Sequence, residues 1–222
     1  MNLALFDLDG TLIERDSDHA FGEFMIKLGW VDGPTFRRRN DIFYQQYLAG
    51  QLDLSAYIDF ATAPWRHRPQ DELSSGLCQF MKEVMQTEVR VPALELVQRH
   101  QQAGDLVAIV TATHEVITRP LADAFGVEHL IAVRLVRDGQ GRVTGAIDGT
   151  PSFREGKVAR VVEWLTSLGH RWTDFDRTLF YSDSTNDLPL MERVSNPVAT
   201  NPGPALLAVA KARGWPIMRL FQ

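Results

Sequence analysis

The apolar residues of this chain fall into short unbroken runs and longer stretches with helical spacing. The runs at residues 3–6, 106–110 and 178–182 are too short for helices and do not alternate with polar residues, which is typical of buried parallel strands. Residues 197–200 predict a last short strand. Because helical stretches separate these strands, the pattern indicates an α/β fold, with a parallel sheet covered on both faces.

The segment between the first two predicted strands shows helical periodicity and no strand pattern. Its four expected helices begin near His19, Pro34, Ser55 and Gln70. Four helices joined by short loops are typical of a compact bundle. We therefore expect a four-helix-bundle-like cap at residues 16–87, inserted into a Rossmann-like three-layer core formed by residues 1–15 and 88–222.

The remaining core pattern adds helices and one hairpin. Helices are expected at residues 92–103, from about 114 to 125, at 155–169, after 187, and at 204–214. Residues 130–137 and 142–147 flank Asp138-Gly139-Gln140-Gly141 and predict two strands of a hairpin.

Composition limits the classes of function. The length of 222 residues fits one large domain or one domain with an insertion, and a hydrophobic content of 45% is ample for a core. A net charge of −5 argues against a nucleic-acid or anionic-membrane partner. The single cysteine, Cys78, is expected to be a buried apolar residue, and it excludes an internal disulfide.

The same features predict a location. We see no apolar run of membrane-spanning length and no basic segment before Asp7 that could begin a signal peptide. We therefore expect a soluble cytoplasmic protein, as a monomer or homodimer.

Polar side chains follow three of the predicted strands, and a lysine begins a helix between the last two. These residues are Asp7 and Asp9, Thr111 and Thr113, Lys157, and Asp183, Asn186 and Asp187. Because the carboxyl ends of parallel strands form the ligand-binding edge of an open α/β sheet, we expect these side chains to lie together.

This set of side chains is suited to phosphoryl transfer. Carboxylates hold a hard divalent cation such as Mg²⁺, and hydroxyl, amide and ammonium groups bind phosphate oxygens. A carboxylate can also attack phosphorus and form an aspartyl phosphate. Taken singly, the residues have simpler interpretations: Thr111 could cap a helix, Lys157 could be solvated, and Asp187 could interact with a helix dipole.

The chain resembles phosphatases of the haloacid dehalogenase superfamily, and the resemblance spans nearly its whole length. It rests on Asp7-Leu8-Asp9-Gly10-Thr11-Leu12, a strand ending in Thr111, Lys157, and Asp183-Ser184-Thr185-Asn186-Asp187. The helical insertion after the first motif resembles the C1 cap of the phosphoserine-phosphatase-like subclass, subfamily IB. Ser182 and Ser184 stand where that subclass usually has glycine.

The resemblance implies roles for the principal residues. Asp7 is expected to be the nucleophile and a metal ligand, and Asp9 the general acid/base with its main-chain carbonyl on the metal. Asp183 is expected to be the third protein ligand of one Mg²⁺ ion. Thr111 and Lys157 are expected to bind the phosphoryl oxygens.

Further residues are implied at the edge of this site. Gly10 and Thr11 would shape the phosphate-binding loop, and Ala112 would lie beside it. Asn186 would reach the phosphate or a metal-bound water, and Asp187 would hold metal waters or Lys157.

Residues that recognise the substrate are harder to assign. Asp16 resembles the acid with which phosphoserine phosphatases read the substrate's amino group, and Asp18 is a second candidate, although both could be helix caps. Arg66, in a cationic loop between cap helices, and His114 are further candidates. A surface loop is the alternative for Arg66.

The sequence therefore predicts a Mg²⁺-dependent phosphomonoesterase that hydrolyses a small, amine-bearing phosphate ester through an aspartyl phosphate. Phosphoserine and histidinol phosphate are the two candidate substrates. Phosphoserine requires an arginine for its carboxylate, whereas an aromatic residue such as Trp65 or Phe43 facing the site favours an imidazole. The alternatives are a phosphotransferase and a non-catalytic regulatory protein on the same fold.

Overall fold

The main sheet of the computed structural model, which describes residues 1–221, has six parallel strands in the order β3-β2-β1-β6-β7-β8. The strands are β1 (Leu3–Phe6), β2 (Leu106–His114), β3 (His129–Val133), β6 (Thr178–Ser182), β7 (Asn196–Thr200) and β8 (Ile217–Met218). The chain order reverses at β1, because β2 and β3 lie on one side of it and β6 to β8 on the other. Ligands of open α/β sheets bind at the carboxyl ends of strands next to such a reversal.

Helices cover both faces of this sheet. They are α5 (Val91–Gln102), α6 (Glu115–Ala124), α7 (Glu155–Ser167), α8 (Leu188–Met191) and α9 (Pro204–Arg213), with short 3₁₀ turns at Trp172–Asp174 and Thr185–Asp187. Ala4 and Phe6 of β1 belong to the core cluster that includes α5 and α6 residues. Leu3 and Leu5 belong to the cluster that includes residues of α7, α8 and α9. The unbroken apolar run is thus buried on both sides, which confirms the three-layer prediction.

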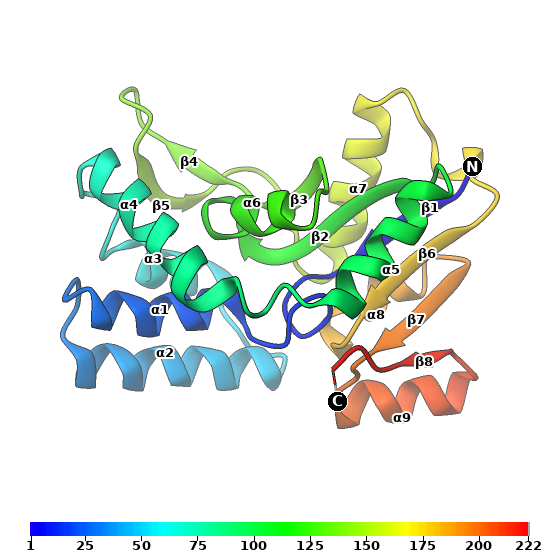
Figure 1. Ribbon diagram of the computed structural model, residues 1–222, viewed down its shortest axis with the longest axis horizontal. Coiled ribbons are helices and arrows are strands. Elements are labelled where there is room, and N and C mark those ends of the chain that lie inside the picture. Colours follow the sequence, from blue (N-terminus) through cyan, green and yellow to red (C-terminus); the bar gives the residue numbers. More distant parts are fainter. Residues whose placement is uncertain (222) are drawn as a thin grey trace.

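The helices that follow β1 gather to one side of the sheet (Figure 1). They are α1 (Ser17–Lys27), α2 (Gly33–Leu48), α3 (Leu54–Thr62) and α4 (Gln70–Phe80). Asp16, Asp32 and Asp53 each accept a hydrogen bond from a backbone amide at the start of α1, α2 and α3, respectively. The four expected cap helices are present, and the division of the chain at residues 16 and 87 stays a prediction. Within residues 1–221, no helix is both long and apolar enough to cross a membrane.

The predicted hairpin is present, but some strand bounds differ from the prediction. The run at 130–137 is two strands: β3 joins the main sheet, and β4 (Leu135–Arg137) pairs antiparallel with β5 (Val143–Ile147). A continuous apolar run can contain two strands, because the hydrophobic pattern does not show where the chain leaves one neighbouring strand and pairs with another. The fourth cap helix continues as a π-helical turn, Met81–Met85, within its expected extent, whereas β2 runs beyond the predicted end at residue 110 to His114.

Cys78 is exposed and not buried. The buried face of α4 carries Leu73, Gly76 and Phe80, and position 78 lies on the opposite side of the helix.

Candidate active site

The carboxyl ends of β1 and β6 and the first turn of α7 bring a buried lysine between two carboxylates. Asp7 directly follows β1, and Lys157 Nζ lies 2.9 Å from its Oδ1. The same Nζ lies 2.7 Å from Asp187 Oδ1, and Ser182 donates a 2.8 Å hydrogen bond to Asp187 Oδ2. All three charged side chains are no more than 4% exposed. This geometry places Lys157 in the site and not in solvent.

The loop after β1, which contains Gly10 and Thr11, packs closely against the side chain of Asp183. Thr11 Oγ1 donates to Asp183 Oδ1 over 3.2 Å. Gly10 has φ +76°, and a Cβ atom there would lie 2.4 Å from Asp183 Oδ2. A side chain at position 10 would therefore be strained and would collide with the carboxylate, so the glycine is required at this close approach.

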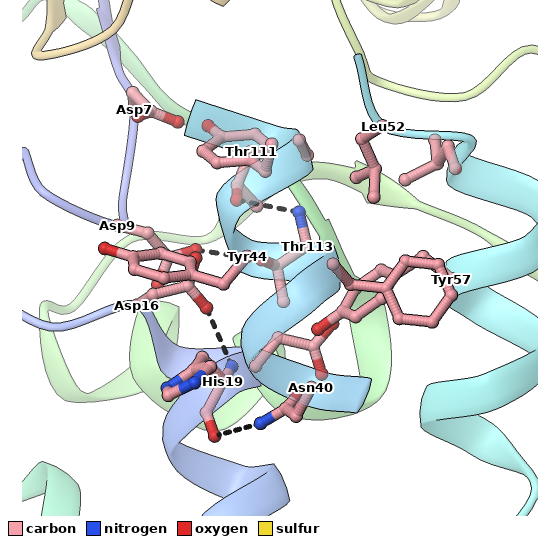
Figure 2. A pocket seen from close by; sticks show the side chains of 15 residues that line it. Asp7, Asp9, Asp16, His19, Asn40, Tyr44, Leu52, Tyr57, Thr111 and Thr113 are labelled. Atoms are coloured by element: carbon pink, nitrogen blue, oxygen red, sulfur yellow. Dashed lines mark hydrogen bonds between the residues drawn. The ribbon is translucent and has the colours of Figure 1, made fainter. Parts of the chain in front are cut away.

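Asp9 is fixed by two donors from different elements. Its Oδ1 accepts a 2.7 Å bond from the backbone amide of Ser17, and its Oδ2 accepts a 2.9 Å bond from Thr113 Oγ1. Thr113 is in turn oriented by its backbone amide, which donates to Thr111 Oγ1 over 3.1 Å (Figure 2). Burial, with the nearby charge of Asp16, raises the pKa of Asp9 to about 7. A carboxyl group that titrates near neutral pH is suited to proton transfer.

The remaining acids leave the site with excess negative charge. Burial and repulsion by Asp7 and Asp187 raise the pKa of Asp183 well above its usual range. Burial also raises the pKa of Asp7, although Lys157 opposes this effect. One lysine cannot balance three carboxylates, and a divalent cation between Asp7 and Asp183 would offset the difference.

The small number of protein oxygens at this site suits Mg²⁺. Within residues 1–221, no group of three His, Cys, Asp or Glu side chains converges as a complete metal-binding set. Two carboxylates, of Asp7 and Asp183, with the main-chain carbonyl of Asp9 would supply few protein oxygens. Mg²⁺ usually keeps several waters and binds through one or two carboxylates plus substrate phosphate, so this small set suits it.

A cavity extends from these residues into the helical cap (Figure 2). It is lined from the core by Asp7, Asp9, Thr111, Ala112 and Thr113, and from the cap side by Asp16, Asp18, His19, Asn40, Phe43, Tyr44, Tyr47, Leu52, Leu54 and Tyr57. No arginine or lysine of the described chain lines it. The cavity is therefore acidic and aromatic.

Three predicted site residues have other positions. Asn186 Nδ2 donates to the carbonyl of Tyr47 at the end of α2 over 3.0 Å, so it contacts the cap. Arg66 does not border the cavity and forms an ion pair of 2.5 Å with Asp59. His114 lies fully buried behind the cavity wall, with Nε2 3.6 Å from Asp18 Oδ1.

The cap contributes residues that the sequence analysis did not assign to the site. Asn40, Tyr44 and Tyr47 lie on one face of α2, and Tyr57 reaches the cavity from α3. Asn40, Tyr44 and Tyr47 are four and three residues apart, and this spacing in the sequence indicates that they share one face of a helix. It does not distinguish a face turned toward a cavity from one buried in the bundle.

Residues 4–192 match the haloacid dehalogenase-like hydrolase family. The chain belongs to this family. It is 42% identical to a histidinol-phosphatase of Neisseria meningitidis serogroup C (strain 8013), over 98% of both chains. These findings confirm the prediction of a phosphatase of the phosphoserine-phosphatase-like subclass.

Two solved structures share the fold of this chain. A protein with unknown function from Bordetella pertussis Tohama I shares 45% identity and a TM-score of 0.93, over 99% of each chain. A substrate-bound phosphoserine phosphatase complex shares 16% identity with a TM-score of 0.68, over 97% of this chain and 91% of the other. The second comparison concerns the fold alone.

Proposed function

We propose that this phosphatase is Mg²⁺-dependent and that its substrate is histidinol phosphate. The observation that carries the choice is the charge of the cavity, which acids and aromatic rings line and to which no arginine or lysine among residues 1–221 contributes. The carboxylate of phosphoserine would find no cationic partner there and would lie near Asp16 and Asp18. The amine and imidazole of histidinol phosphate suit both kinds of side chain.

The relative named histidinol-phosphatase supports the same substrate. Phe43, one of the two aromatic residues expected to favour an imidazole, lines the cavity. Trp65, the other, is buried in the cap with its ring 5.7 Å from that of His114.

The geometry supports covalent catalysis in two steps. An Asp7 carboxylate oxygen bonds to phosphorus as the bond from phosphorus to the alcohol oxygen breaks, and the proton of Asp9 goes to that oxygen. Water then attacks the phosphorus of the aspartyl phosphate, Asp9 takes its proton, and Asp7 is released with inorganic phosphate. Lys157, between Asp7 and Asp187, keeps the nucleophile ionised and oriented.

Other residues bind the phosphoryl group. When bound by Asp7, Asp183 and the Asp9 carbonyl, Mg²⁺ would offset the negative charge of that group and of the carboxylates. The hydroxyl of Thr111, at the cavity wall, is proposed to donate to a phosphoryl oxygen. Asn186 is proposed to couple the site to the cap through its bond to Tyr47.

The substrate proposal is tested by steady-state kinetics on matched esters. We expect kcat/KM for histidinol phosphate to exceed that for phosphoserine by about 100-fold or more, because a buried carboxylate without a partner is strongly disfavoured. Release of one inorganic phosphate for each ester consumed distinguishes hydrolysis from phosphotransfer. Equal or faster turnover of phosphoserine would refute the substrate assignment.

Metal removal tests the cofactor. We expect EDTA to abolish hydrolysis of 4-nitrophenyl phosphate and Mg²⁺ to restore it. Ca²⁺ should restore little activity, because it favours longer bonds and higher coordination numbers than Mg²⁺. Undiminished turnover in metal-free buffer would contradict the proposal. Cytoplasmic location, the absence of a nucleic-acid partner and the oligomeric state stay predictions.

A further inference from the structure

Several buried polar atoms at the cavity wall and behind it have no hydrogen-bond partner among the described residues. They are Asp18 Oδ2, both ring nitrogens of His114 and the indole Nε1 of Trp65. The three residues are 5%, 0% and 1% exposed, respectively. A buried polar group without a partner costs free energy, so most such groups in native proteins are paired. Of these three residues, only Asp18 lines the cavity, where a ligand could pair with it.

The two acids at the start of α1 differ in what they already bind. Asp16 Oδ1 accepts a 2.8 Å hydrogen bond from the backbone amide of His19, as the helix cap. Asp16 lines the cavity and also an open surface pocket beside Glu14 and Arg15. Asp18 lines the cavity but not that surface pocket. Asp18 is therefore the more deeply placed carboxylate, and its Oδ2 is buried without a hydrogen-bond partner among the described residues.

The order of the acids follows the order of groups in the proposed substrate. Asp9 lies just after β1 at the reacting end, Asp16 is the N-cap of α1, and Asp18 lies in the first turn of that helix. All three line the one cavity, so carboxylates border it from the reacting end into the cap. In histidinol phosphate the amine is closer than the imidazole to the ester oxygen.

We infer, resting on the proposed function, that Asp18 recognises the imidazole ring of the leaving alcohol by accepting a hydrogen bond from a ring N–H. Asp16 would then pair with the amine, which is closer to the ester oxygen. Phe43, Tyr44 and Tyr57 line the same cavity and offer aromatic surface to a flat ring. Asp18 is thereby a specificity-determining residue for this phosphatase.

His114 acts on Asp18 from behind the cavity wall, as a positioning residue. Its Nε2 is 3.6 Å from Asp18 Oδ1, and its ring centroid lies 5.7 Å from that of Trp65. Burial lowers the pKa of His114 to about 4, so at neutral pH the ring is uncharged. A neutral ring confines the Asp18 side chain without cancelling its charge. The other polar or charged groups beside Asp18 are the Tyr57 hydroxyl, His19 and Asp16.

The test compares three esters: histidinol phosphate, 2-aminoethyl phosphate, which lacks the ring, and 4-nitrophenyl phosphate, which lacks both nitrogen groups. In Asp18→Asn we expect the ratio of kcat/KM for histidinol phosphate to that for 2-aminoethyl phosphate to fall by about 10- to 100-fold, as expected for losing a hydrogen bond to a charged group. Because both esters are measured on one preparation, the ratio does not depend on the folded fraction.

Asp71→Asn is the matched control. Asp71 lies in the first turn of α4, is exposed and does not line the cavity, and its substitution removes the same charge from the cap. The ratio should stay at the wild-type value in this variant. An unchanged ratio in Asp18→Asn, or an equal fall in Asp71→Asn, overturns the assignment of Asp18. If the wild-type enzyme itself does not prefer histidinol phosphate, the proposed function fails, and the assignment fails with it.

His114 is tested by a pair of substitutions. His114→Phe keeps a ring but removes both nitrogens, and we expect KM for histidinol phosphate to rise about tenfold with little change in kcat. His114→Gln keeps a polar atom near Asp18 and should recover most of the loss. A rise in KM of the same size for 4-nitrophenyl phosphate, or no recovery in the glutamine variant, would show a merely structural role and refute the positioning role.

Discussion

Replacing Asp7 with asparagine is expected to lower kcat for every phosphate ester by about 10³-fold or more. An amide is not a competent nucleophile toward phosphorus, and the second step has no aspartyl phosphate to hydrolyse. The asparagine side chain has nearly the same size as aspartate, and its carbonyl can still accept from Lys157. The folded structure should therefore be kept, as thermal unfolding can verify.

A second measurement separates nucleophile from metal ligand, since Asp7 is expected to be both. Rapid quenching with acid should trap phosphate covalently on the wild-type protein and none on Asp7→Asn. Asp183→Asn removes a proposed ligand but keeps the nucleophile, so it should still trap some phosphate at high Mg²⁺. Retention of more than about a tenth of wild-type activity by Asp7→Asn would refute the assignment.

The core of the site could be predicted because its geometry is local to each strand. Asp7 follows β1 and Asp183 follows β6, and these two strands are neighbours in a parallel sheet. Once strands and helices alternate, their carboxyl ends must share one edge. Lys157 could be placed at that edge for the same reason, because it begins the helix α7.

The cap could not be placed in this way. Which side chains of α2 and α3 face the cavity depends on how the helices dock, and docking is not encoded in the periodicity of one helix. Asn186 illustrates this point, because its partner is the carbonyl of Tyr47, 139 residues away. Arg66 forms an ion pair with Asp59 and does not line the cavity. These contacts join segments whose order in the sequence does not show that they meet.

The sequence also did not show that no arginine or lysine of the described residues lines the cavity. Arg37, Arg38 and Arg39 lie on α2, as do the cavity residues Asn40 and Tyr44, but all three arginines are exposed. A rotation of α2 by about one residue, 100° around its axis, would exchange these faces. The choice between the two candidate substrates thus depended on a packing detail.

Removing the charge of Lys157 is expected to affect both stability and catalysis. Burial alone would lower the pKa of Lys157, but the carboxylates of Asp187 and Asp7 outweigh that effect and raise it. In Lys157→Met three buried acids lose their single protein cation. Breaking a buried pair in this way costs about 3–5 kcal/mol, which urea denaturation would measure in metal-free buffer. Turnover should fall by about 10²-fold or more at saturating Mg²⁺.

A double variant separates the two effects. Lys157→Met with Asp187→Asn removes one positive and one negative charge, so the site keeps the net charge of the wild type. We expect it to regain most of the lost unfolding free energy, because the uncompensated carboxylate next to position 157 is gone. Activity should stay low, since no ammonium group orients Asp7 or meets the phosphoryl oxygens. If the single variant is as stable as the wild type, Lys157 does not balance the buried acids. If the double variant regains activity to within tenfold of the wild type, its role is structural and not catalytic.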